Sequence, residues 1–244
     1  MLEPLTGRRF RLRHGRFSWS WLVLLFGTVA GLAPESARAQ QSEHGDSQVW
    51  IDPKVTVGLT DKLDFSAEAL LELTDDASRT GLLLIRPTLT YRLTNRFSIG
   101  GGYTYLATDD HVGSDFHEHR IVEEATVLTT DDFNKPVLTL RTRLEERFRE
   151  GEREMGLRVR GLARVDVPIG GSRRLVGWSE VFVGLNSTVW SGQSGPGQLI
   201  SFAGVHLPLS GKLSVEPGYI NQTIFDPGRN RVRHAFAVFL NAKL

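Results

Sequence analysis

Residues 137–148 read VLTLRTRLEERF, and they decide the fold because apolar and charged side chains alternate along them. A β-strand sends successive side chains to opposite faces, so this period of two predicts a strand with one mostly apolar and one charged face. The charged face carries Arg141, Arg143, Glu145 and Arg147, and the apolar face carries Leu138, Leu140, Leu144 and Phe148. In a soluble β-sandwich the charged face would meet water. In a transmembrane barrel it would line the lumen, with the apolar face in lipid.

The rest of the chain favours the barrel, because turn signals divide it into eleven segments of similar length. Tilted strands of about 9–11 residues cross a membrane, and outer-membrane barrels alternate short turns with longer loops. We therefore predict an all-β fold, an antiparallel up-and-down transmembrane β-barrel of about 10–12 strands. Bacterial barrels usually have an even number of strands, so the parity stays open. The segments are 48–60, 63–73, 81–93, 97–107, 118–130, 135–149, 155–169, 173–187, 198–209, 213–223 and 231–244.

The N-terminus has the three parts of an export signal. Five arginines precede residue 17, an apolar run spans 19–33, and residues 37–39 read ARA, which fits cleavage after Ala39. A membrane anchor is the alternative, but this run is shorter than the roughly 20 residues that a spanning helix needs. We predict a cleaved signal peptide at 1–39, a polar leader at 40–47 and one barrel domain at 48–244, located in the outer membrane of a Gram-negative bacterium.

Charge and composition exclude several functions. The whole chain has a net charge of +1, but the mature chain has 23 basic and 26 acidic residues, a net charge of −3. This removes the electrostatic argument for nucleic-acid binding. The chain has no Cys, which excludes disulfides, thiolate nucleophiles and cysteine metal sites. We expect the partners to be outer-membrane lipids, the barrel insertion machinery and, under one interpretation of the lumen, small anionic solutes.

The charged faces of the predicted strands form the candidate site, a lumen charge network. Two interpretations stay open. The charges pair across the lumen and close it, because unpaired charge in a confined space is costly. Alternatively, an arginine-lined wall draws anionic solutes into the barrel. The predicted network residues are Glu68, Arg86, Arg141, Arg143, Glu145, Arg147, Arg158, Arg160, Glu180 and Glu216.

No motif indicates an enzyme. Three histidines at 111, 117 and 119 stand among acidic residues, but their spacing matches no recognised metal motif, and we interpret them as part of a solvated loop. There is no G-x-S-x-G elbow. We predict no catalytic residues, no metal and no cofactor. The Gly100–Gly102 run is expected to ease strand curvature or make room for a neighbour.

Aromatic residues near segment ends are typical of the girdles at membrane interfaces. The same residues also have a high strand propensity, so they are consistent with a girdle without requiring one. The residues are Trp50, Tyr91, Tyr103, Tyr105, Phe148, Trp178, Trp190 and Tyr219.

Eight stretches carry a resemblance to a known family. They are LIRP at 84–87, SIGGGY at 98–103, EHR at 118–120, RTRLEERF at 141–148, LRVR at 157–160, EVFVGLN at 180–186, EPGYINQ at 216–222, and His234. Together they resemble the bacterial domain of unknown function 2490 family, whose uncharacterised members are expected to be outer-membrane β-barrels. Pro217, and the absence of an N-R pair at 198–200, depart from the pattern. The resemblance implies fold and location, and it transfers no catalytic residue.

We therefore expect an integral outer-membrane β-barrel with a structural or envelope role and a narrow, charge-paired lumen. The first alternative is a small anion-selective channel or solute-binding barrel that uses the arginine-lined wall. The second is a soluble periplasmic β-barrel that binds a ligand.

Overall fold

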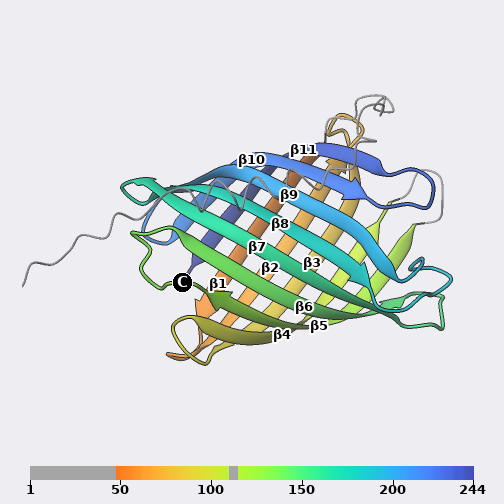
Figure 1. Cartoon of the computed structure of the whole chain (residues 1–244), viewed down its shortest axis with the longest axis horizontal. Coiled ribbons are helices and arrows are strands. Elements are labelled where there is room, and N and C mark those ends of the chain that lie inside the picture. The colour runs from red at the N-terminus through yellow and green to blue at the C-terminus, as the bar shows by residue number, and fades with distance from the viewer. Residues whose placement is uncertain (1–47, 110–114) are drawn as a thin grey trace, which may run out of the picture. The chain divides into compact units, whose positions relative to one another are not determined.

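Eleven β-strands close into a barrel in the computed structural model, which describes residues 48–109 and 115–244 (Figure 1). No helix long and apolar enough to span a membrane occurs in these two ranges. The strands are β1 (Gln48–Gly58), β2 (Leu63–Thr74), β3 (Arg79–Arg92), β4 (Phe97–Thr108), β5 (Phe116–Leu128), β6 (Val137–Arg149), β7 (Gly156–Gly170), β8 (Arg173–Gly184), β9 (Gly195–Pro208), β10 (Leu213–Ile224) and β11 (Arg231–Lys243).

The barrel closes through a parallel pair. Every strand pairs antiparallel with the next one in the chain, whereas β1 pairs parallel with β11, from Gln48 opposite Ala235 to Thr56 opposite Lys243. Eleven alternating strands require this, because the first and the last then run in the same direction. The predicted all-β up-and-down barrel is confirmed, and the open parity resolves to an odd number of strands among the described residues.

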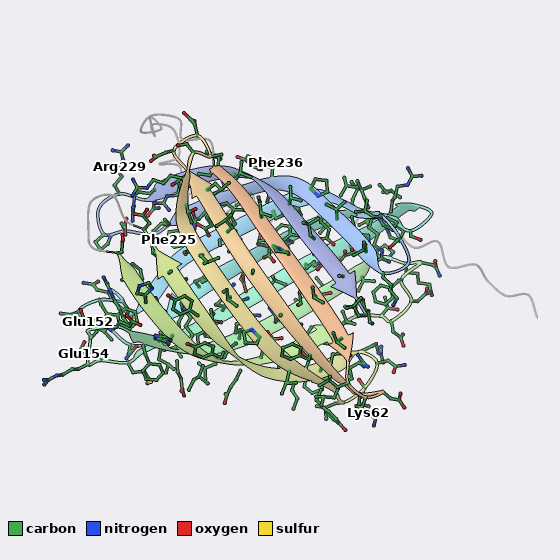
Figure 2. The ribbon with its side chains drawn as sticks, turned by 180° about the vertical axis from the view of Figure 1, so that it is seen from behind. Lys62, Glu152, Glu154, Phe225, Arg229 and Phe236 are labelled. Carbon is green, nitrogen blue, oxygen red and sulfur yellow. The ribbon has the colours of Figure 1, made fainter. Side chains whose placement is uncertain are left out.

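The connections define two ends of the barrel. The turn end carries 59–62, 93–96, 129–136, 171–172 and 209–212, and the loop end carries 75–78, 109–115, 150–155, 185–194 and 225–230. In Figure 2, Lys62 marks the turn end and Glu152 marks the loop end. The predicted alternation of short and long connections is wrong at 129–136, which has eight residues, and at 75–78, which has four.

Two strand boundaries differ from the predicted segments for local reasons. β6 begins at Val137 because Pro136 has no amide hydrogen to give to the sheet. β8 ends at Gly184, three residues before the predicted end. Beyond it, the Asn186 side chain accepts a hydrogen bond from the Leu157 amide (2.7 Å) and donates one to the Met155 carbonyl (2.8 Å), so the chain leaves the sheet.

An apolar cluster occupies one half of the lumen, on β8–β11 and β1. At its centre Phe202 stacks on Trp178 with ring centroids 5.5 Å apart, and Phe239 meets Phe202 edge-on at 5.1 Å. A Cβ added at Gly204 or Gly218 would lie 2.4 Å from the Phe202 ring, so these glycines make room for it. The buried members are Trp50, Val176, Phe182, Ile200, Phe202, Ile220, Ala235 and Ala237.

The opposite faces of the strands carry large apolar side chains that remain exposed. On β3, for example, Leu83, Ile85, Leu89 and Tyr91 alternate with the inward Leu84 and Arg86. Exposed residues of this kind occur on ten of the eleven strands; among them are Val55, Phe65, Ile99, Tyr103, Ile121, Leu140, Phe148, Ile169, Leu175, Tyr219, Phe236 and Leu240. The outer surface is therefore apolar almost all the way around the barrel.

The aromatic prediction is wrong for two of its residues. Trp50 is buried among the inward cluster, and Trp178 packs against it, so neither belongs to an outer girdle. Trp190 lies in the loop-end connection 185–194, where its indole donates to the Glu154 carbonyl at 2.9 Å. The prediction that the Gly100–Gly102 run makes room for a neighbour agrees with the packing at Gly102. A Cβ added there would lie 2.5 Å from the Pro87 carbonyl oxygen of the neighbouring strand.

Candidate functional site

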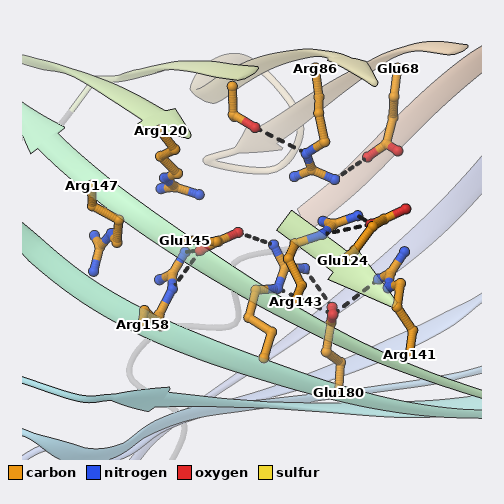
Figure 3. A network of polar contacts seen from close by, with 12 residues as sticks. Glu68, Arg86, Arg120, Glu124, Arg141, Arg143, Glu145, Arg147, Arg158 and Glu180 are labelled. Atoms are coloured by element: carbon orange, nitrogen blue, oxygen red, sulfur yellow. Dashed lines mark hydrogen bonds and ion pairs between the residues drawn. The ribbon is translucent and has the colours of Figure 1, made fainter. Parts of the chain in front are cut away.

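A network of seven arginines and five glutamates fills the other half of the lumen, and Figure 3 shows part of it from close by. Strand alternation builds it, since each strand contributes every second residue on its inward face. β6 supplies four members in succession and β7 supplies two. The members are Glu68, Arg86, Glu118, Arg120, Glu124, Arg141, Arg143, Glu145, Arg147, Arg158, Arg160 and Glu180.

Glu145 is the centre of the network and is completely buried, with 0% of its surface exposed. It accepts hydrogen bonds from Arg158 Nε at 2.8 Å and from Arg160 Nη1 at 2.9 Å. Arg160 also donates to Glu180 (Nε–Oε1 3.2 Å), which accepts a further bond from Arg141 at 3.0 Å. Two carboxylates and three guanidiniums thus form one chain of charge-assisted hydrogen bonds across β6, β7 and β8.

A second part of the network lies at the loop end of β5 and β6. Glu118, with 1% of its surface exposed, accepts from Arg120 Nε at 2.6 Å and from Arg147 at 2.6 and 3.0 Å. The Arg147 guanidinium also lies 5.0 Å from the centre of the Trp190 ring. Side chains therefore fill this side of the lumen near its loop-end mouth.

Glu68 and Arg86 extend the network to β2 and β3. Arg86 donates to Glu68 at 2.8 Å and to the Thr104 hydroxyl at 3.1 Å. Between the neighbouring strands β5 and β6, Arg143 donates to Glu124 at 2.7 Å.

Glu216 belongs to a separate group. It accepts from Arg164 at 2.8 and 2.9 Å and contacts His206 Nδ1 at 2.9 Å. Arg164 also pairs with Asp166 at 2.8 Å. All ten residues of the predicted network therefore point into the lumen and have an ion-pair partner, although Glu216 lies outside the main network.

The main network has more positive than negative charge, since seven guanidiniums share five carboxylates. Two buried donor atoms in it, Arg141 Nε and Arg143 Nη1, have no hydrogen-bond partner. Arg143 has only 3% of its surface exposed, so bulk water does not solvate it. Buried unpaired donors are costly, and this part of the lumen therefore favours an anion.

A cavity of about 1170 Å³ lies between the charged and the apolar halves of the lumen. Ten cationic side chains and six carboxylates line it, an excess of four positive charges. Its apolar lining includes Trp178, Phe239 and Leu70, and it extends to Ser210 and Lys212 in a turn-end connection. The residues that sequence reasoning missed are these apolar ones, together with Glu118, Arg120, Lys54 and Asp52.

The histidines considered as metal ligands lie apart from the lumen. β5 alternation sends Glu118 inward and His117 and His119 outward, where they contact the hydroxyls of Tyr105 (2.7 Å) and Tyr103. Residues 110–114, with the third histidine, lie outside the described residues. In the described ranges no three His, Asp or Glu side chains are grouped as a metal site would require.

Two comparisons with known proteins find relatives, and neither assigns an activity. The family described as "Protein of unknown function (DUF2490)" matches residues 47–233, which run from the start of β1 into β11. The uncharacterized protein MexAM1_META1p0181 of Methylorubrum extorquens is 30% identical over 217 residues, which cover 87% of this chain and 90% of that protein.

Proposed function

Since the chain belongs to the DUF2490 family of proteins of unknown function, we propose a function from geometry: an integral outer-membrane β-barrel with an envelope role, whose Arg–Glu network blocks free flow through the lumen. In this proposal the protein is not an enzyme. Its partners are membrane lipids and the machinery that inserts barrels.

The apolar outer surface is the observation that carries the proposal. Large exposed side chains such as Ile85, Ile99, Leu140 and Phe236 project from the barrel wall (Figure 2 labels Phe236). Soluble monomers rarely expose contiguous apolar patches of more than a few hundred Å², whereas a membrane barrel requires an apolar band on its outer face. The same observation disfavours a soluble periplasmic barrel, whose outer face would be polar.

The export features support the location. The basic and apolar stretches before Ala39 fit a signal peptide, and the apolar alternation of β11 runs nearly to the C-terminus. Under this proposal the turn end, where β11 finishes, faces the periplasm, and the loop end faces outward.

Membrane extraction tests the proposal directly. We expect the protein to remain in the envelope fraction after a urea wash, to require detergent for release, and to migrate differently on a gel before and after boiling. Recovery from the soluble periplasm without detergent would contradict it.

An anion-conducting barrel is the second candidate, favoured by the excess of cationic side chains around the cavity. Planar-bilayer conductance separates the two candidates. A blocked lumen predicts a silent bilayer with the purified protein, and the Arg141→Ala/Arg143→Ala variant mainly loses stability. Steady conductance, with an anion preference that this double change weakens, would replace the blocked barrel with a narrow anion channel.

A further inference from the structure

The lumen has two chemically different walls that face one cavity. Arg141 lines the cavity from β6, and Trp178, Phe239 and Leu70 line it from β8, β11 and β2. The two walls are adjacent, because Arg141 bonds Glu180, and Glu180 is the inward neighbour of Trp178 on β8. A purely structural lumen filling would not leave an aromatic surface open beside an excess of cationic side chains.

We propose that this cavity binds an amphipathic anion, a molecule with one carboxylate or phosphate head and one apolar chain. The head lies beside Arg141, and the chain lies along Trp178, Phe239 and Leu70. This inference adds a ligand to the proposed membrane barrel. It does not depend on the barrel being in a membrane, since the cavity belongs to the lumen itself.

The charge balance selects the head group. The seven guanidiniums of the main network exceed its five carboxylates by two, and Arg141, whose side chain is 23% exposed, lines the cavity with Glu180 as its ion-pair partner. The other charges nearby nearly offset one another: Lys54 and Asp52 are inward neighbours on β1, and Glu72 interacts with Arg233. A carboxylate or phosphate beside Arg141 would offset part of this positive excess, because such groups form short charge-assisted hydrogen bonds with arginine.

The aromatic wall selects the chain. The Phe202 ring stacks on Trp178 with centroids 5.5 Å apart, and the Phe239 ring meets Trp178 edge-on with centroids 6.1 Å apart. The apolar wall is therefore packed before any ligand binds. Apolar pockets with a few polar groups are typical of small-molecule sites, and the volume of about 1170 Å³ lies just above their usual range of about 300–1,000 Å³, so a ligand with a long chain fits.

Two further buried polar atoms favour a ligand rather than empty space. Trp50 and Gln222 are among the residues that line the cavity, and the buried Trp50 indole nitrogen and Gln222 side-chain oxygen have no hydrogen-bond partner. The lining of the cavity runs from Lys212 at the turn end to Ile224 and Arg233 near the loop end.

Tryptophan quenching by brominated amphiphiles tests the proposal. Both proteins compared carry Trp190→Phe, and one of them also carries Trp178→Phe. The difference between their fluorescence emissions is assigned to Trp178. We expect dibrominated stearate to quench this emission saturably at about one ligand per barrel. Dibrominated stearate methyl ester, which has no charge, should not saturate. A brominated lysophosphatidate in parallel tells whether the head is a phosphate or a carboxylate.

Two controls keep the result specific. Arg141→Met should weaken stearate binding roughly tenfold, the factor expected when one charge-assisted contact is lost. Arg149→Met is the matched change on the same strand, where Arg149 contacts the Phe116 ring and does not line the cavity, and it should leave binding unchanged. Brominated phosphatidylcholine vesicles measure any quenching through the barrel wall.

Quenching by the acids that equals quenching by the ester, or that persists unchanged in Arg141→Met, would overturn the proposal. Because the assay also works in detergent or buffer, a failure of ligand binding is distinguishable from a failure of the membrane proposal, which extraction tests separately.

Discussion

Glu145→Gln is the change that tests the ion network most sharply. Gln has nearly the same volume as Glu, so the substitution removes the charge without opening a cavity. Glu145 is fully buried and accepts from both Arg158 and Arg160. After the change Arg160 still has Glu180, but Arg158 loses the one carboxylate with which it forms an ion pair among the described residues.

The expected loss in unfolding free energy is about 3–5 kcal/mol, the cost of leaving a buried charge uncompensated. Glu146 provides the matched control, because it is the next residue on β6, faces outward and forms no ion pair among the described residues. Glu146 lies near the loop end of β6, where charge on the lipid face costs little, so Glu146→Gln should change the stability by no more than about 0.5 kcal/mol.

Urea unfolding of the refolded protein in micelles, followed by tryptophan emission and by the gel shift on boiling, measures both variants. The double variant Glu145→Gln/Arg158→Met should recover about 1–3 kcal/mol, because the stranded charge is then removed as well. If Glu145→Gln unfolds within 1 kcal/mol of the wild type, or the double variant recovers nothing, the account of a tightly paired lumen is refuted.

Two other substitutions test the two faces of the wall. Glu123 is exposed on the outer face of β5, so Glu123→Leu should raise stability in lipid by roughly 1 kcal/mol. Glu152→Leu, in the loop 150–155, should have no effect. Urea titrations of the two variants in vesicles compare them, and equal stabilities would argue against lipid contact at Glu123. Gly218→Ala would force a Cβ against Phe202 and should cost about 1–3 kcal/mol, whereas Gly211→Ala in an open turn should be neutral; thermal melts compare them, and an unaffected Gly218→Ala would mean that Phe202 does not pack on this glycine.

Period-two alternation was sufficient to predict which charged residues of β6 and β7 line the lumen. Residues 137–148 predicted both faces of β6, and the same parity places Arg158 and Arg160 inward on β7. The same alternation also predicts that Trp178 points inward, because it lies two positions from the inward Glu180 on β8. Its place near a segment end suggested an interfacial aromatic girdle instead.

Pairing across the lumen could not be predicted in this way. Arg164 and Glu216 are 52 positions apart and lie on β7 and β10, so their contact depends on how the barrel curves and closes. The apolar half of the lumen was missed for a related reason. Apolar inward residues such as Ile220 and Ala237 have no charge to distinguish their face from a lipid-facing one, and only the closed register assigns them to the interior.

Cysteine scanning of β6 tests the central claim, an apolar outer face in lipid and a charged inner face, most directly. The native chain has no cysteine, so each variant carries a single thiol. An environment-sensitive dye is attached in turn at 138, 139, 140, 142 and 144 of the vesicle-inserted barrel, and quenching by nitroxide-labelled lipid is compared with quenching by a water-soluble agent. We predict strong lipid quenching at the outward sites 138, 140, 142 and 144 and none at the inward site 139. Equal access of the water-soluble agent to all the outward sites would contradict a barrel embedded in a membrane.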